Sequence, residues 1–157
     1  GRVARLRYRV GRAPPELYLV DPPGYGPSVA TERQRRDWDA LAAAYCKTRA
    51  TLAAAVLVVD ATRGLCAADA RWLALVAART HAVVALSKAD LLDADDLAVA
   101  ARLVADDGGA RVFPTCGTTG AGVRALWRHV ASVAAAASVR PHGPRGVQIH
   151  KAAWVER

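Results

Sequence analysis

Short apolar runs that end abruptly at polar loops recur along this chain and alternate with segments of helical periodicity. The pattern predicts strands at Leu17–Asp21, Ala53–Asp60, Ala82–Leu86 and Arg111–Pro114, and helices at Thr31–Ala50, Ala68–Arg79, Ala94–Ala105 and Val123–Ala137. Continuous apolar runs of this length are typical of strands covered on both faces. The alternation therefore predicts an α/β fold with a mostly parallel sheet between layers of helices, connected by right-handed crossovers.

The first residues follow a different pattern, in which arginines alternate with apolar side chains. Residues 2–10 are predicted to form a strand with one cationic face in solvent, and a turn leads from it into Leu17–Asp21. The two strands are expected to pair as an antiparallel hairpin. Arg5, Arg7 and Arg9 either contact RNA phosphates or only protect a solvated edge strand, and the pattern favours neither.

The first predicted helix begins with a capping residue and a basic run. Thr31 is expected to cap it. Four side chains recur at helical spacing and are predicted to face the core: Trp38, Leu41, Ala42 and Tyr45. The basic run consists of Arg33, Arg35 and Arg36. Positive charge at this end opposes the helix dipole, which favours a role in contacting a partner such as RNA.

Composition narrows the classes of partner and compartment. Hydrophobic residues make up 53% of the chain, enough for a packed core, and the net charge of +8 favours an anionic partner, with nucleic acid first. The three cysteines are far apart and form no C-x-x-C or Cys/His pattern, so we expect free thiols in a reducing compartment and no zinc. Charges interrupt the apolar runs, so no membrane span is expected.

Three loops follow predicted buried strands and should meet at one edge of the sheet, where open α/β folds bind ligands: Asp21–Gly26, Ser87–Asp90 and Thr115–Gly120. In the first loop, Asp21 can hold a magnesium-bound water and Gly24 lets a backbone N–H approach a phosphate. The D-x-P-G sequence alone is also compatible with an ordinary turn.

The second and third loops carry groups that suit one base. Asp90 can accept two N–H bonds from the donor pair of guanine, Lys88 can lay its aliphatic stem against the base plane, and Ser87 can fix the loop through its hydroxyl. The backbone of residues 116–118 can donate to an acceptor on the base. A site built to pair such groups rejects a base that lacks them, because its own polar groups are then left unpaired.

These residues resemble a known family. The order D-x-P-G, [N/T/S]-K-x-D and a loop like S-A-x matches the second half of the P-loop GTPase motifs. From about residue 5 to 138 the chain is more narrowly similar to the EngB (YihA/YsxC) family, through Val20–Gly26, Trp38 with Tyr45–Arg49, Val58–Gly64 followed by Asp69, and Leu86–Asp90. The resemblance implies a three-layer P-loop GTPase G domain over residues 1–138. Residues 139–157 then form a basic tail, with a short strand or helix expected around Val147–Trp154.

The resemblance also implies roles for the first loop. Asp21 would face Mg²⁺ through water, and Gly24 would donate its N–H to the γ-phosphate of GTP. Tyr25 occupies the position at which Ras-like proteins place the glutamine that orients the attacking water. Because a tyrosine cannot act in the same way, intrinsic hydrolysis is expected to be slow and to depend on a partner such as ribosomal RNA.

The same resemblance assigns the base to the other two loops. Lys88 and Asp90 would recognise guanine, with Ser87 in place of the family's usual Thr or Asn. Cys116 and Gly117 stand where Ser-Ala is usual. The cofactors implied are GTP or GDP with Mg²⁺.

One part of the family's motif set is absent. No G-x-x-x-x-G-K-[S/T] occurs anywhere in the sequence, although that loop supplies the phosphate cradle, the phosphate lysine and the magnesium hydroxyl. In the family, the strand before this loop is central, between the strands predicted here at Leu17–Asp21 and Ala53–Asp60. We therefore expect a sheet that lacks its central strand, with the place filled by an N-terminal segment of the intact protein or by another chain.

Two functions follow from the resemblance. The first is a GTPase that assists assembly of the large ribosomal subunit, provided that the phosphate loop is present in the intact protein. Its partners would be large-subunit ribosomal RNA, ribosomal proteins or other assembly factors. The alternative is a degenerate G domain that binds ribosomal RNA or protein as a non-catalytic scaffold, which the divergent Pro22, Ser87, Cys116 and Gly117 favour. An α/β domain unrelated to nucleotides is the least favoured. The arginine-rich, divergent character favours a mitochondrion over bacterial cytoplasm or plastid.

Overall fold

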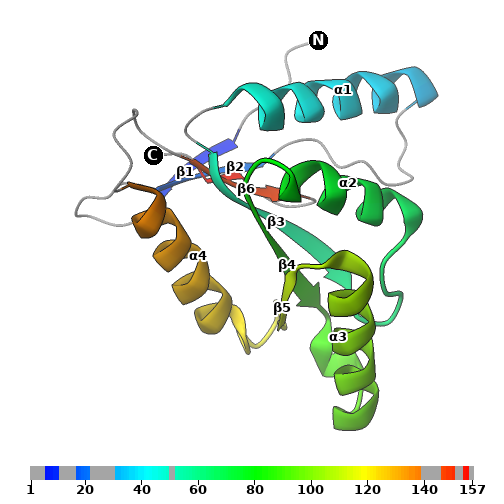
Figure 1. The fold of residues 1–157 in the computed structure, drawn as a ribbon. Helices are drawn as coiled ribbons and strands as arrows, with labels where there is room; N and C mark the ends of the chain where they lie inside the picture. The colour runs from blue at the N-terminus through cyan, green and yellow to red at the C-terminus, as the bar shows by residue number, and fades with distance from the viewer. Residues whose placement is uncertain are drawn as a thin grey trace.

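The computed structural model describes residues 6–10, 17–21, 31–49, 52–138, 146–150 and 154–155, which form one mixed sheet with helices on both faces (Figure 1). Its strands are β1 (Leu6–Val10), β2 (Leu17–Asp21), β3 (Leu52–Asp60), β4 (His81–Ser87), β5 (Arg111–Pro114), β6 (Gly146–His150) and β7 (Trp154–Val155). Its helices are α1 (Glu32–Thr48), α2 (Ala67–Ala77), α3 (Ala94–Gly108) and α4 (Val123–Ser138), with a 3-10 turn at Ala89–Leu91. The α/β class predicted from the sequence is confirmed.

The strands at the centre of the sheet run in one direction. The strand order is β1-β2-β7-β6-β3-β4-β5, and β3 pairs in parallel with both β4 and β6, while β4 pairs in parallel with β5. β2 is antiparallel to β7, which is antiparallel to β6, so β2 points the same way as β3. The carboxyl ends of β2, β3, β4 and β5 therefore lie at one edge of the sheet, as expected. The predicted hairpin of β1 and β2 is also present.

The helices cover the sheet as two separate layers. Ala55 and Leu57 of β3 pack in a core with α1, α2 and α3, whereas Ala54 and Val56 pack in a second core with α4. This alternation buries β3 on both sides, because successive side chains of a strand point to opposite faces. The three-layer arrangement predicted from the sequence is present (Figure 1).

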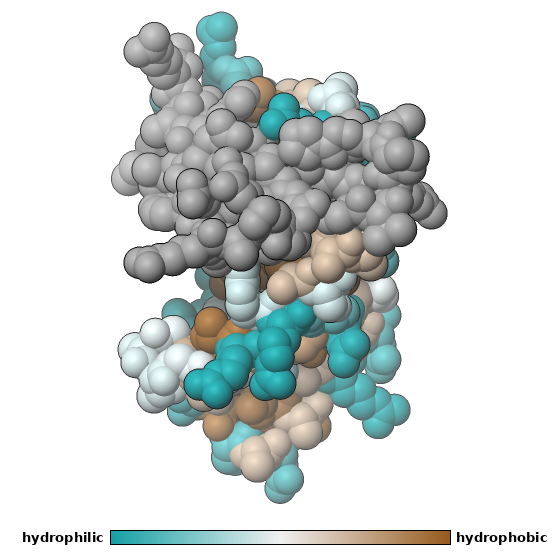
Figure 2. All heavy atoms as spheres, turned by 90° about the vertical axis from the view of Figure 1, so that its left-hand side faces the viewer, coloured by the Kyte–Doolittle hydropathy of each residue, from teal (hydrophilic) through white to brown (hydrophobic). Residues whose placement is uncertain are grey.

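Among the described helices, α4 is the one that covers the second face of the sheet. Its Leu126, Trp127 and Val130 pack against the sheet. Its outer side includes the exposed Arg124 and Arg128, and the described surface on this side of the molecule mixes hydrophilic and apolar side chains (Figure 2). Among the residues that the structure describes, no helix combines the length and the apolar character needed to cross a bilayer.

α1 begins as predicted but turns a slightly different face to the core. Thr31 and Gln34 form a reciprocal capping box, in which Thr31 Oγ1 accepts from the Gln34 amide at 3.3 Å. Ala42 and Cys46, one turn apart, are buried, whereas Leu41 is 40% exposed. The prediction that Leu41 faces the core is wrong, because the buried stripe follows Ala42 and Cys46 at positions i and i+4. Tyr45 is half-buried, and the Trp38 side chain lies outside the described residues.

The place between β2 and β3, where the sequence predicts a missing strand, contains β6 and β7 of the chain itself. β6 pairs in parallel with β3 from Leu52 to Leu57, and β7 connects β6 to β2 through antiparallel pairs. The strand or helix expected around Val147–Trp154 is thus two strands inside the sheet. The polar N–H and C=O groups of a buried strand need hydrogen-bond partners on both sides, and here the chain's own C-terminal strands provide them.

Candidate functional site

The loops that follow β4 and β5 are hydrogen-bonded to each other at the carboxyl edge of the sheet. The Ala89 amide donates to the Thr115 carbonyl at 3.1 Å, and the Thr115 amide donates to the Leu86 carbonyl at 2.8 Å. These bonds bring the Ser87–Asp90 loop against the Thr115–Gly120 loop. The predicted meeting of these two loops is confirmed.

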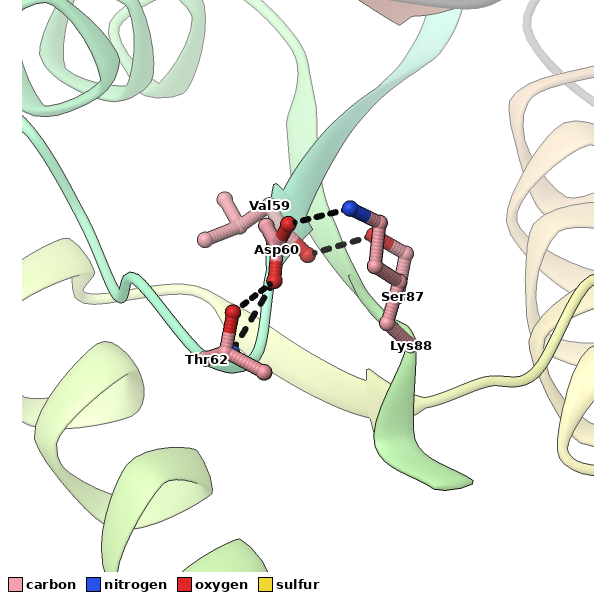
Figure 3. Close-up of polar contacts among 5 residues, drawn as sticks. All are labelled: Val59, Asp60, Thr62, Ser87 and Lys88. Carbon is pink, nitrogen blue, oxygen red and sulfur yellow. Dashed lines mark hydrogen bonds and ion pairs between the residues drawn. The ribbon is translucent and has the colours of Figure 1, made fainter. Parts of the chain in front are cut away.

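The start of the β4 loop is fixed from both sides. The Ser87 hydroxyl donates to the Val59 carbonyl at 2.9 Å, so it joins the end of β4 to β3 in the way the sequence suggested (Figure 3). Lys88 adopts φ 57° and ψ 34°, the left-handed region that residues with a Cβ rarely enter. The backbone reverses there into the 3-10 turn, which leaves the Asp90 side chain exposed.

A carboxylate that the sequence analysis did not assign to the site holds the Lys88 side chain. Lys88 Nζ lies 2.7 Å from Asp60 Oδ2, while the amide and hydroxyl of Thr62 donate to Asp60 Oδ1 at 3.0 and 2.7 Å (Figure 3). The Lys88 hydrogen bond and then the Thr62 hydroxyl lower the pKa of Asp60 to about 2, against a smaller opposing effect of burial. Asp60 is therefore ionised at neutral pH. The signal in the sequence was an acid at the carboxyl end of the strand next to the Lys88 strand.

The β5 loop carries a buried thiol beside Asp90. Cys116 Sγ lies 3.0 Å from the Thr118 hydroxyl and accepts from the Thr119 amide at 3.4 Å. The hydrogen bonds from Thr118 and then Thr119 lower the pKa of the Cys116 thiol, whereas the nearby Asp90 side chain acts in the opposite direction. Cys116 and Asp90, from different loops, therefore lie next to each other. All three cysteines are free thiols, as expected.

The backbone donors of the β5 loop are not equivalent. The Cys116 amide already donates to the Ala121 carbonyl at 2.9 Å. The amides of Gly117 and Thr118 have no hydrogen-bond acceptor among the described residues, and the space around Gly117 is open. Gly117 and Thr118, and not Cys116, are therefore the amide donors that this loop can offer to a ligand.

Two glycines that the sequence analysis did not single out shape this loop. Gly120 and Gly122 both have positive φ, at 76° and 74°. A Cβ on Gly122 would lie 1.9 Å from the Pro114 carbonyl oxygen, so only glycine fits where the chain passes the end of β5. The G-x-G spacing just before α4 was the available signal.

The predicted phosphate and metal side of the site is only partly described. Asp21 ends β2 at the same edge of the sheet, with β7 and β6 between it and β3. The Asp21 side chain and Gly24 lie outside the described residues, as does Tyr25. Within the described ranges, no group of three or more His, Cys, Asp or Glu side chains could hold a metal ion.

Only some of the arginines predicted to contact RNA lie within the described residues. Arg33 and Arg36 are exposed on α1, and Arg36 forms a 2.9 Å ion pair with Glu32 one turn earlier. Such a surface pair contributes about 0–1 kcal/mol and leaves most of the guanidinium in solvent. Arg5 and the side chains of Arg7, Arg9 and Arg35 lie outside the described residues.

Comparison with known proteins supports the resemblance to GTP-binding proteins that the sequence motifs suggest. No protein-family model matches the chain. A protein of Bordetella pertussis named "Probable GTP-binding protein EngB" is 38% identical over 76 residues, which cover 48% of this chain and 37% of that protein. The chain resembles EngB proteins. EngB proteins so named from Anaeromyxobacter dehalogenans and Rhodopseudomonas palustris are 35% and 34% identical over 136 and 134 residues, or 83% and 80% of this chain.

The EngB relatives are longer than the region they share with this chain. The alignments cover 63% and 62% of the Anaeromyxobacter and Rhodopseudomonas proteins, so the chain spans less than two thirds of the length of these EngB relatives. The matches support the EngB resemblance, and the fold is consistent with a P-loop GTPase G domain.

Proposed function

We propose that the chain forms the guanine-recognising part of an EngB-type GTP-binding protein. The observation that carries the proposal is the hydrogen bond from the Ala89 amide to the Thr115 carbonyl, which joins the two loops that the base would contact. It places the exposed Asp90 carboxylate beside the loop that offers the Gly117 and Thr118 amides. The names of the EngB relatives support GTP as the ligand.

The chemistry of the two loops fits guanine. The Asp90 carboxylate has only acceptors and would take the two N–H donors on one edge of guanine. The Gly117 and Thr118 amides would donate to the guanine O6, and the Lys88 stem would lie against the ring. Adenine presents an amino group where guanine has O6, so the same loops would face it with mismatched donors.

We further propose hydrolysis of GTP, with Mg²⁺ held by Asp21 through water, for a protein that carries the phosphate loop as well as these residues. The resemblance supports assistance in assembly of the large ribosomal subunit, and the arginine-rich, divergent sequence favours a mitochondrion over bacterial cytoplasm or plastid. The charge of +8 supports contact with ribosomal RNA through exposed arginines. Magnesium would neutralise phosphate charge when bound.

A second candidate is a scaffold that binds ribosomal RNA or protein without hydrolysis. The observation that favours it is the position of β6 and β7, which fill the centre of the sheet between β2 and β3. The two candidates differ in a calorimetric titration of the intact protein with GTP and Mg²⁺. Heat of binding together with phosphate release supports the GTPase, whereas RNA binding with no response to GTP supports the scaffold.

Guanine recognition is tested by titrating the 157-residue chain with guanosine, adenosine and xanthosine. Asp90→Ala should abolish the preference for guanosine and leave the unfolding transition intact. Asp90→Asn should exchange the preference toward xanthosine, because a carboxamide offers one donor and one acceptor in place of two acceptors. Asp95→Asn, at an exposed acid on α3, is the matched control and should change nothing. A preference for guanosine that survives Asp90→Ala would refute the proposal.

A further inference from the structure

Asp60 stands beside the predicted base-contacting lysine because of strand register. β3 and β4 pair in parallel, and Asp60 lies opposite Ser87, one residue before Lys88. The acid and the lysine therefore leave neighbouring strands at the same level of the sheet edge. The 2.7 Å ion pair between them follows from this register and needs no extended loop.

The Asp60 carboxylate is itself oriented. The Thr62 amide and hydroxyl both donate to Oδ1, and Lys88 approaches Oδ2 (Figure 3). A carboxylate held through one oxygen presents the other in a fixed direction, and its side chain is only 21% exposed. Asp60 is thus a fixed counter-charge, in contrast to the exposed acids on the helix surfaces.

Lys88 is consequently restrained at both ends. Its backbone lies in the left-handed region, and its ammonium is paired with Asp60, although 59% of the side chain remains exposed. A free lysine stem samples many rotamers and loses that freedom when a ligand packs on it. The ion pair restricts the stem before a base arrives, and it neutralises the charge of the ammonium.

We propose that Asp60 is a positioning residue for guanine recognition, which acts by holding the Lys88 stem in place for the base, with Thr62 orienting the carboxylate. The inference rests on the proposed function in one respect, that Lys88 contacts the base. In this proposal the Lys88 ammonium stays paired with Asp60, so Lys88 contacts the base through its methylene stem.

The test is a double-mutant cycle in guanosine affinity on the 157-residue chain. Asp60→Asn keeps the size of the side chain and an oxygen for Thr62 but removes the charge, and it should raise the Kd for guanosine about threefold to tenfold, the range for immobilising one flexible side chain. Asp60→Asn should have little further effect once Lys88→Met has removed the ammonium. Asp106→Asn breaks another acid's ion pair, with Arg102 on α3, and should leave the Kd unchanged.

The outcomes separate the inference from the proposed function. An unchanged or lower Kd in Asp60→Asn, or an equal loss in the Lys88→Met background, would overturn the positioning role. Should the wild-type chain bind no guanosine, the proposed function fails instead, and lysine acetylation then decides whether Asp60 restrains Lys88. The sequence holds three lysines, Lys47, Lys88 and Lys151, so Lys47 on the exposed face of α1 is an internal reference. Lys88 should react more slowly than Lys47 in the wild type and at a similar rate in Asp60→Asn, and equal rates in both would refute the restraint.

Discussion

Substitution of Gly122 by alanine should destabilise the fold through the loop that follows β5. A residue with a Cβ in the left-handed region costs about 1–2 kcal/mol, and Gly122 has φ 74°. The new Cβ would also lie 1.9 Å from the Pro114 carbonyl oxygen, a backbone atom that cannot swing aside. Forced overpacking of this kind costs about 1–3 kcal/mol. The expected loss in the free energy of unfolding for Gly122→Ala is therefore about 2–5 kcal/mol.

Gly120→Ala provides the matched control for this prediction. Gly120 has nearly the same φ, 76°, but a Cβ there would meet no atom within 4 Å. Its cost should therefore be the conformational part alone, about 1–2 kcal/mol. Urea denaturation followed by circular dichroism measures both variants against the wild type. Equal losses in the two variants, within about 0.5 kcal/mol, would show that the contact with Pro114 does not constrain the loop.

Three further predictions concern other parts of the molecule. Burial, followed by the charges of Arg111 and His81, lowers the pKa of His129, so the unfolded chain binds more protons and the fold should lose stability as the pH falls below about 6.5. His129→Gln should flatten this loss in thermal denaturation between pH 7.5 and 5.5, and parallel curves would contradict the assignment. Gln148→Pro removes an amide from β6 and should lower the free energy of unfolding by at least about 1 kcal/mol in urea; an unchanged midpoint would mean that β6 contributes no stability. RNA binding should weaken as the salt concentration rises, with a slope of several units in a plot of log affinity against log salt concentration. A flat response in a filter-binding assay would mean that the arginines only keep the surface soluble.

The sequence predicted the secondary structure well wherever a local signal was strong. The buried run of β3 and the cap at Thr31 both appear in the structure as predicted. Leu41 was misplaced because periodicity gives the width of an apolar stripe more reliably than its rotation, and in α1 the small Ala42 and Cys46 approach the sheet.

The candidate site was also predictable in part, where it depends on residues that are close in the sequence. Ser87, Lys88 and Asp90 are adjacent in the chain, and the carboxyl ends of parallel strands meet at one edge, so their neighbourhood with the β5 loop followed from the fold class. The role of Asp60 did not follow, because the ion pair with Lys88 depends on the register between two strands. Likewise, the use of the Cys116 amide by Ala121 is set by the turn through Gly120 and Gly122.

By itself the sequence determined the strands β1 to β5, the helices and the identity of the loops at the sheet edge, because these depend on periodicity and turn residues within a few positions. Apart from the predicted hairpin of β1 and β2, only the tertiary structure decided which strands are neighbours. It placed β6 and β7 between β2 and β3, and it paired Asp60 with Lys88. Pairing between distant segments is decided by which backbone groups can satisfy each other in the packed sheet, and no local pattern encodes that choice.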